Sequence, residues 1–392
     1  MKPRVLMLTE RFPPDIGGLA RSGARTAGAL VALGAEVDVL AWTRSLPPGA
    51  METVEAGTVA DSAKGATLHR LGLFANWDLS MQHTLNVLEW LHKDRDFEMT
   101  WGHYLYPAGF LAVMFAASVD IPSTVSARGN DIDQMMFPPG DFGRLMWTLE
   151  RATARTAVSH DLSRKMDLLL GRDAEAFVVP NSVNMDVFSP GQPDASLRTS
   201  LSIGDDEAIL GFSGELRHKK GFPFLLDALT TVREERPACL LVIGEVRARE
   251  QAHLAAYRAA CPEDAARIIV TGRIDEPEEV ARHLRLCDVV LQPSVWDGLP
   301  NAVLEAMSCE RVVLASNAGG IPDAIVHHES GFLIDKAMLN KLGIATIEAL
   351  DLPTADRRKM EIAARRRIET CFQAGVEAAA LTAVLERLLP ES

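Results

Sequence analysis

Residues 4–42 read RVLMLTERFPPDIGGLARSGARTAGALVALGAEVDVLAW, and this stretch decides the fold class. Its first part, Arg4–Thr9, is an apolar run typical of a buried strand. Small and apolar residues then recur with helical spacing over Gly23–Leu33, and Val37–Trp42 reads as a second strand. A strand, a helix and a strand in this order form a βαβ unit, whose two strands run parallel. We therefore predict an α/β fold that begins with a doubly wound parallel sheet.

The same alternation of short apolar runs and helical segments continues along the chain. Further predicted strands are Met99–His103, Ser123–Ser126, Thr156–Ser159, Ala176–Pro180, Ala208–Phe212, Leu240–Ile243, Ile268–Thr271, Val289–Gln292 and Val312–Ala315. A polar segment rich in proline and glycine, Asn181–Pro193, separates two such series. We therefore expect two Rossmann-like domains, residues 1–187 and 188–370, that face a cleft. Near the C-terminus the basic run Arg365–Arg367 is expected to lie on a solvated helix face.

Charge and composition exclude several classes of function. With 392 residues and a formal net charge of −13, the chain is long enough for two cores and unsuited to non-specific nucleic-acid binding. The five cysteines show no short paired spacing, so we expect neither a metal site nor disulfides, and a cytoplasmic location. The longest apolar run, Ala108–Val119, has 12 residues, short of the roughly 20 that span a bilayer. Peripheral contact with a membrane surface stays open.

The segment PSVWDGLPNAVLE, residues 293–305, combines a strand end, a turn and a helix start. The free N–H groups of the helix start, near Asn301, suit a diphosphate. Asp297 in the loop and Glu305 one turn into the helix can accept hydrogen bonds from sugar and ribose hydroxyls. The alternative is that Asp297 caps the helix and that Glu305 is a surface or ion-paired residue.

A second segment, GELRHKKG at Gly214–Gly221, follows a predicted strand and precedes a predicted helix. Arg217 and Lys220 belong to its cluster of basic and imidazole side chains, at the carboxyl edge of the second sheet. A cation there can balance the charge that builds on a departing diphosphate. Taken alone, the cluster also fits a basic surface turn. The chain has neither a Walker A pattern nor a G-x-G-x-x-G pattern, so ATPase and dehydrogenase functions have no motif support.

Three further motifs follow predicted strands of the first domain. Gly17 and Gly18 precede a helix and allow close backbone approach to a phosphate or a sugar. His103 lies at a strand end, and Arg128 and Asp131 bring a cation and a carboxylate after the next strand. Each motif alone has a structural explanation. Together with the two segments of the second domain, however, all of them fall at the carboxyl ends of strands, where parallel sheets bind ligands.

In order and spacing these motifs resemble one family. PP-x-x-GG at 13–18, HYLYPAG at 103–109, SARGND at 126–131, SGELRHKKGF at 213–222 and the segment from residue 293 are similar to the retaining glycosyltransferases of family 4, which have the GT-B fold. The resemblance covers nearly the whole chain. It implies transfer of a sugar from a nucleoside-diphosphate sugar, UDP- or GDP-linked, without a divalent metal or other cofactor. The acceptor would be a carbohydrate, a lipid-linked molecule or a small molecule.

The resemblance also implies roles for individual residues. Asp297 and Glu305 occupy the two ends of the family's E-x7-E motif. Lys220 matches its phosphate-binding lysine, and His103 the histidine beside the donor sugar. The catalytic residues implied are His103, Arg217, Lys220, Asp297 and Glu305; the donor-binding residues are Gly17, Gly18, Arg273, Gly298, Leu299, Asn301 and Ala302; the acceptor-binding residues are Arg128 and Asp131. As in relatives, a C-terminal helix, residues 371–392, should join the first domain.

Two positions depart from the family pattern. The first carboxylate of the motif is Asp297 rather than the usual glutamate, and Glu215 stands where relatives usually have arginine. We therefore expect Arg217 to supply the missing guanidinium. The rival functions are a nucleotide-sugar epimerase or a phosphorylase, which no motif supports, and a binding-only relative of the transferases. Acceptor loops are expected around Asn76–Gln82 and Phe137–Phe142, whereas the base, the sugar and the acceptor cannot be read from the motifs.

Overall fold

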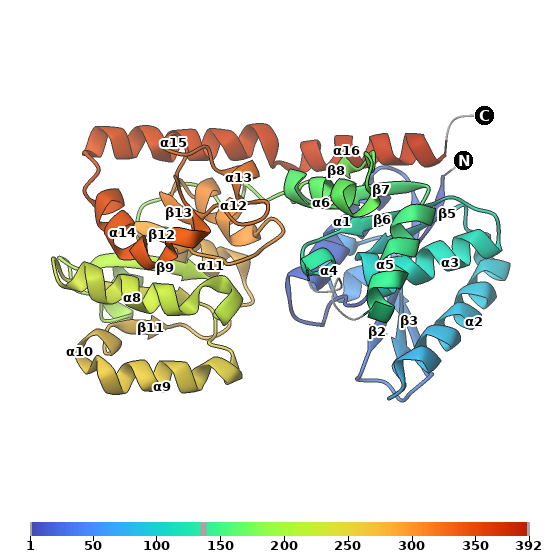
Figure 1. The fold of residues 1–392 in the computed structure, drawn as a ribbon, viewed down its shortest axis with the longest axis horizontal. Coiled ribbons are helices and arrows are strands. Elements are labelled where there is room, and N and C mark those ends of the chain that lie inside the picture. Colours follow the sequence, from blue (N-terminus) through green and yellow to red (C-terminus); the bar gives the residue numbers. More distant parts are fainter. Residues whose placement is uncertain (1, 134–138, 390–392) are drawn as a thin grey trace. The chain divides into compact units, whose positions relative to one another are not determined.

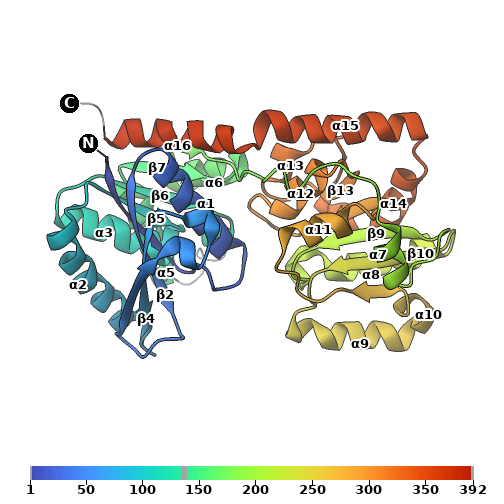
Figure 2. The same cartoon turned by 180° about the vertical axis from the view of Figure 1, so that it is seen from behind.

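The computed structural model describes residues 2–133 and 139–389. The chain forms two compact units (Figures 1 and 2). Unit 1 comprises Met1–Asn181 together with Glu377–Ser392, and unit 2 comprises Ser182–Val376. The sequence predicts that the chain passes from the first domain to the second after residue 187 and returns to the first at residue 371. In the structure the chain passes to unit 2 after Asn181 and returns to unit 1 at Glu377, a few residues from the predicted boundaries. The expected acceptor loop at Phe137–Phe142 falls partly outside the described residues.

Unit 1 is built on an eight-stranded sheet in the order β3-β4-β2-β1-β5-β6-β7-β8. The strands are β1 (Arg4–Thr9), β2 (Glu36–Thr43), β3 (Met51–Glu55), β4 (Thr67–Gly72), β5 (Met99–His103), β6 (Ser123–Ala127), β7 (Ala154–Ala157) and β8 (Phe177–Val178). All neighbours are parallel except β3, which is antiparallel to β4. The predicted parallel sheet is confirmed. The pair β3–β4 was outside the prediction, because β3 is a largely exposed edge strand with little apolar sequence.

Helices cover both faces of this sheet (Figure 1). They are α1 (Gly18–Ala32), α2 (Trp77–Arg95), α3 (Phe110–Ser118), α4 (Asn130–Asp133), α5 (Pro139–Arg151), α6 (His160–Leu170) and α16 (Ala374–Leu388), with short helical turns at Ala56–Thr58, Asp61–Ala63 and Leu105–Gly109. Along β1, Val5 and Met7 point into the core beneath α1 and α16. Leu6 and Leu8 point into the opposite core beneath α2 and α3, as the strand period of two requires.

Unit 2 is built on a six-stranded parallel sheet in the order β11-β10-β9-β12-β13-β14. The strands are β9 (Ala208–Ser213), β10 (Ala238–Ile243), β11 (Ile268–Val270), β12 (Val289–Gln292), β13 (Val313–Ser316) and β14 (Phe332–Ile334). The helices are α7 (Ala195–Ser200), α8 (Phe222–Arg233), α9 (Gln251–Ala260), α10 (Pro262–Ala265), α11 (Pro277–Leu284), α12 (Asn301–Ser308), α13 (Ile321–Ala324), α14 (Leu342–Leu350) and α15 (Thr354–Cys371), with turns at His218–Lys220, Ala248–Glu250 and Lys336–Lys341. A core of α8, α14 and sheet residues holds the unit together.

The C-terminal helices serve both units. Leu381, Val384 and Leu388 of α16 are fully or almost fully buried in the core of unit 1. The expectation of a solvated Arg365–Arg367 face holds for the exposed Arg366 and is wrong for its two neighbours. Arg365 donates to the carbonyl oxygens of Phe188 and Ser308 at 2.9 Å each, and Arg367 donates to a carbonyl oxygen of unit 2. By length and composition alone, Thr354–Leu388 could cross a membrane. This is weak evidence for a membrane-spanning helix, because core helices of soluble proteins pass the same test.

Candidate active site

In unit 2 the loops after two neighbouring strands meet at the carboxyl edge of the sheet. Strand β9 leads into the GELRHKKG loop, and β12, its neighbour, leads into the PSVWDGLP loop. The approach is close at Gly221, where an added Cβ would lie 2.0 Å from the carbonyl oxygen of Pro293 and where φ is +79°. The backbone N–H of Val295 donates to the carbonyl oxygen of Lys219 at 2.8 Å. The sheet order therefore brings the two predicted segments together.

Lys220 and Asp297 form an ion pair at this edge, with 2.5 Å between Nζ and Oδ2. Ser294 Oγ donates to the same carboxylate at 3.3 Å, and the backbone N–H of Gly298 donates to Oδ1 at 3.1 Å. Burial acts to raise the pKa of Asp297, but the charges of Lys220 and Lys219 and these hydrogen bonds outweigh it and lower the pKa. Asp297 is thus an ionised acceptor that is already oriented.

Helix α12 begins at Asn301, and Pro300 is its N-cap. No side chain caps the helix, so the alternative that Asp297 is the cap is wrong. The first-turn N–H groups near Asn301 and Ala302 therefore have no side-chain acceptor. Glu305 lies one turn further along the helix and is half-buried.

A third loop, GGIPD at residues 319–323 after β13, packs against the backbone of the Asp297 loop. Gly319 has φ +55°, and an added Cβ there would lie 1.7 Å from the carbonyl oxygen of Asp297. The N–H of Gly320 donates to the carbonyl oxygen of Gly298 at 2.6 Å, next to the buried Leu299. The paired glycines, a weak signal in the sequence, thus fix the backbone on which Asp297 and Gly298 stand.

Glu215 lies between two arginines. Arg217 Nη1 is 3.5 Å from one carboxylate oxygen of Glu215, and Arg247 Nε is 3.6 Å from the other. Arg247 belongs to the loop after β10, which pairs with the GELRHKKG loop through Leu216 and Val246. The sequence analysis missed Arg247, although GEVRARE at 244–250 repeats the pattern of GELRHKK at 214–220. In this structure the guanidinium of Arg217 contacts Glu215.

Several buried polar atoms at this edge have no hydrogen-bond partner among the described residues. They are Trp296 Nε1, Asn301 Oδ1, Gln292 Oε1 and Arg217 Nε. Buried polar groups are normally satisfied, so a cluster of orphans at one edge of a sheet fits a place where a polar ligand binds. Arg273, expected to contact the donor, lies after the edge strand β11 and pairs with Asp275 at 2.5 Å.

At the carboxyl edge of unit 1, the fully buried His103 ends β5. The hydroxyl of Ser22 donates to the carbonyl oxygen of Leu19 at 3.0 Å, so His103 Nε2 carries the hydrogen and donates to Ser22 Oγ at 2.9 Å. His103 Nδ1 is then an acceptor, and it has no partner among the described residues. Burial, followed by the charges of Arg128 and Arg25, lowers the pKa of His103 well below 6.5. The ring is neutral at pH 7.

The two predicted acceptor-binding residues are held by internal contacts. Asp131 is fully buried and accepts the backbone N–H groups of Arg128, Gly129 and Leu105 at 2.7–3.2 Å. Burial raises the pKa of Asp131 to about 6. Its carboxylate therefore shapes the SARGND loop. Arg128 Nη2 donates to Asn181 Oδ1 at 2.5 Å, and its side chain is half-buried.

The glycine pair before α1 is open to a ligand. Gly17 has φ +132° and is the N-cap of α1, without a side-chain cap. A Cβ added at Gly17 or Gly18 would meet nothing within 4 Å. A 15-residue helix with uncapped N–H groups and open space before it suits an anion. Tyr104, directly after His103, was missed by the sequence analysis; its φ of +103° is a strained value of the kind found at functional sites.

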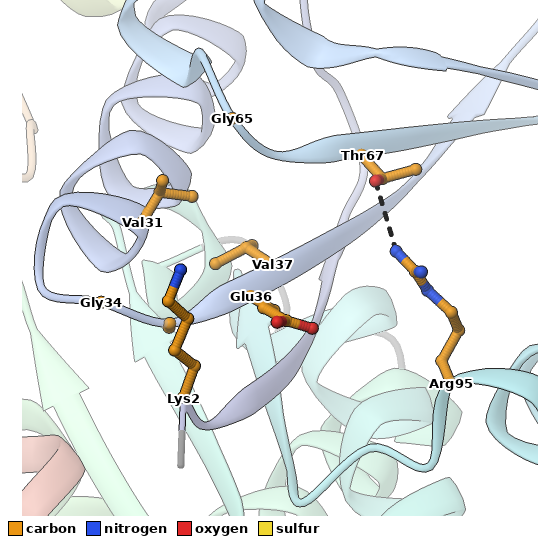
Figure 3. Close-up of a pocket in the computed structure, with 9 residues that line it drawn as sticks. Lys2, Val31, Gly34, Glu36, Val37, Gly65, Thr67 and Arg95 are labelled. Atoms are coloured by element: carbon orange, nitrogen blue, oxygen red, sulfur yellow. Dashed lines mark hydrogen bonds between the residues drawn. The ribbon is translucent and has the colours of Figure 1, made fainter.

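A pocket of about 360 Å³ in unit 1 lies away from all these residues (Figure 3). It is lined by Lys2, Glu36, Thr67 and Arg95, among others, where β1, β2 and β4 begin. It therefore occupies the amino edge of the sheet, opposite to the carboxyl edge that carries the predicted site. Within residues 2–133 and 139–389, no group of three or more His, Cys, Asp or Glu side chains could hold a metal ion.

Comparison with known proteins gives the family. Residues 17–182 match a glycosyl transferase 4-like domain, and residues 207–351 match the glycosyl transferases, group 1. The D-inositol 3-phosphate glycosyltransferase of Segniliparus rotundus is 30% identical over 264 residues, which cover 66% of this chain and 56% of that protein. For three curated relatives, the match spans 50–58% of their length.

Solved structures share the fold along the whole chain. The glycosyltransferase of Rickettsia africae ESF-5 gives a TM-score of 0.79 at 14% identity, with 100% of both chains covered. Anabaena HepE in complex with UDP-glucose gives 0.78 at 17% identity, with 98% of this chain and 100% of that chain covered. The predicted GT-B fold of two parallel-sheet domains is thereby confirmed. With both family models matched in order along most of its length, the chain belongs to the glycosyl transferases of group 1.

Proposed function

We propose that this protein is a retaining, metal-independent glycosyltransferase that moves a sugar from a nucleoside-diphosphate sugar to an acceptor hydroxyl. The observation that carries the proposal is the Lys220–Asp297 pair at the carboxyl edge of the unit 2 sheet. A nucleotide sugar offers hydroxyls to the carboxylate and a diphosphate to the ammonium group. The orphaned polar atoms beside the pair support a polar ligand at the same place.

Each donor group has a candidate partner. Asp297 accepts from sugar hydroxyls, and Glu305 on α12 accepts from the ribose. Lys220 and the uncapped start of α12, near Asn301, compensate the negative charge of the diphosphate. They thereby take the role that a divalent ion has in other transferases. Uridine is the favoured base, because a structural neighbour, HepE, has been solved with UDP and with UDP-glucose.

The chemical step needs few protein groups. As the bond between the anomeric carbon and the phosphate oxygen breaks, negative charge builds on the leaving diphosphate, and Lys220 stabilises it. The leaving oxygen accepts the proton of the attacking acceptor hydroxyl on the same face of the sugar, so the anomeric configuration is retained. The neutral His103 offers Nδ1 as an acceptor beside the donor sugar. Unit 1 is assigned the acceptor, through the SARGND loop. The free cysteines support the cytoplasm as compartment.

The test is a panel of nucleotide sugars with slow donor hydrolysis as the readout, repeated in EDTA. Retained turnover in EDTA supports metal independence, and NMR of the product's anomeric proton reports retention. Thermal shifts with UDP, GDP and ADP identify the base, because a ligand raises stability by RT ln(1 + [L]/Kd). Binding of a nucleoside diphosphate without turnover of any donor would favour a binding-only protein. Such a protein is compatible with the ion pairs of Lys220 with Asp297 and of Arg217 with Glu215, in which both cations already have a carboxylate partner.

A further inference from the structure

Two arginines of unit 1 share one amide oxygen. Arg25 on α1 and Arg128 after β6 both donate to Oδ1 of Asn181, from Nη2 atoms 2.7 and 2.5 Å away. Both side chains are half-buried, whereas Asn181 is buried. The two guanidinium groups are therefore close neighbours at the carboxyl edge of the sheet, beside the strand that ends at His103.

Among the side chains that the structure describes, one carboxylate is hydrogen-bonded to this arginine pair, Arg25 with Arg128. Glu377 of α16 accepts from Arg25 Nε with both oxygens, at 3.1 and 2.9 Å. Asp131, the next carboxylate, accepts backbone N–H groups of its own loop and also acts electrostatically on Arg128. Glu10, after β1, lies close enough to Asp131 and to Arg11 to interact with both. Burial, and then the charge of Arg25, lowers the pKa of Arg128 to about 10, although the charges of Glu377 and Asp131 act to raise it.

Two like charges at close range in a half-buried place oppose folding unless an anion compensates them. A guanidinium presents several N–H donors in a planar fork that matches phosphate oxygens, and the guanidinium of Arg128 makes one hydrogen bond to the described residues, to a neutral amide. A phosphate monoester brings up to two negative charges, which match the pair.

We propose that Arg25 and Arg128 bind a phosphate group of the acceptor, so that the acceptor is a phosphorylated sugar or polyol, free or lipid-linked. This rests on the proposed transferase function and names its acceptor class. Arg128 thereby acts through its guanidinium on the substrate, while Asn181 and Glu377 hold the pair in position. The charges of both arginines act on the ring of His103, the last residue of β5. The phosphate therefore binds near the carboxyl end of β5.

The first experiment measures binding of inorganic phosphate to the full chain by calorimetry. Arg128→Gln should weaken binding about tenfold or more, the size of a lost charge-assisted hydrogen bond. Arg128→Lys should weaken it less, and keeps the fold testable if the glutamine variant unfolds. The control is Arg21→Gln, an exposed arginine of the same helix as Arg25, which should bind like the wild type. Unchanged binding in both Arg128 variants, or an equal loss in Arg21→Gln, overturns the proposal.

The second experiment compares sugar and polyol phosphates with their dephosphorylated forms as acceptors, and adds vesicles containing a polyprenyl phosphate. The proposal expects a higher kcat/KM for phosphorylated acceptors, and a preference that shrinks about tenfold in Arg128→Gln but not in Arg21→Gln. Equal kcat/KM for phosphorylated and neutral acceptors overturns it, while the vesicle arm separates lipid-linked from free phosphates. If UDP, GDP and ADP all fail to bind the wild type, the proposed transferase function fails instead, whatever inorganic phosphate does.

Discussion

The carboxyl edges of the two sheets carry cations in different balance. In unit 2, one ammonium group, that of Lys220, meets one carboxylate, that of Asp297, at 2.5 Å. In unit 1, the guanidinium groups of Arg25 and Arg128 share an amide oxygen, and within the described part of the chain Glu377 is the one carboxylate that is hydrogen-bonded to them. A balanced pair favours a ligand that offers both donors and an anion, whereas an unbalanced pair favours an anion alone. The same fold thus prepares its two edges for different ligands.

The largest expected effect breaks the balanced pair. Lys220→Ala should lower kcat with a nucleotide sugar about 100-fold or more, because the charge on the leaving diphosphate loses its cation. Steady-state kinetics measures this, with Lys219→Ala as the neighbouring control, expected to lose less than about tenfold. A rate near that of the wild type would mean that Lys220 serves only to neutralise Asp297.

The next effect removes the carboxylate of the unbalanced pair. Glu377→Gln should lower the free energy of unfolding by about 3 kcal/mol, at the low end for a broken buried ion pair, because 21% of the Arg25 side chain is exposed. Denaturant unfolding measures the change, and Glu386→Gln, an exposed position on the same helix, should change it by less than about 0.5 kcal/mol. In the same variant inorganic phosphate should bind more tightly. An unchanged phosphate affinity would argue that Glu377 does not compete for the pair.

The third effect is a pH dependence in unit 1. Because the pKa of His103 lies well below 6.5 in the folded protein, the unfolded chain binds a proton that the folded chain does not. The stability is complete above pH 6.5 and falls as the pH drops below it, by up to about 1.4 kcal/mol per pH unit. Unfolding curves of the wild type and His103→Gln between pH 7.5 and 5 should therefore converge on acidification. Asp131 titrates in both proteins, so parallel curves would contradict a neutral buried His103.

The smallest effect concerns the shortened carboxylate of unit 2. Asp297→Glu should keep kcat/KM within about threefold of the wild type, or raise it, if the carboxylate accepts from a sugar hydroxyl. Asp297→Asn should lose more, because Lys220 then lacks its counter-charge. Kinetics on both variants separates the two outcomes. A collapse of binding in Asp297→Glu would show that the loop held by Gly319 and Gly298 fits only the shorter side chain.

Strands that are buried on both faces could be predicted from the sequence. Arg4–Thr9, Met99–His103 and Val289–Gln292 are strands with the predicted bounds, because each is a short apolar run. The pair β3–β4 and the edge strand β14 escaped, since edge strands expose alternate residues and carry less apolar sequence. The Arg365–Arg367 run was misjudged in part, because the sequence does not show that Arg365 meets open carbonyl oxygens at Phe188 and Ser308.

The two loops that form the site in unit 2 could be predicted from the sequence. Strand order places the loops of Lys220 and Asp297 side by side, and each had been singled out by its own motif. The partners of Arg25 and Arg128 could not be predicted, because Asn181 and Glu377 lie far from them in sequence and helix α16 brings Glu377 to Arg25. Their side chains carry no motif. Long-range polar pairs of this kind emerge from the fold, not from local spacing.

The return of α16 also sets an order for making the protein on the ribosome. Leu381, Val384 and Leu388 complete a core whose other side chains, such as Val5 and Met7, are synthesised first. All of Ser182–Val376 must be translated in between, on the order of ten seconds or more at cellular elongation rates. During that interval nascent unit 1 has an open apolar face while unit 2 already has the residues for its own sheet. The domain begun first is therefore finished last, and it is the one for which a chaperone bound to the nascent chain has most to cover.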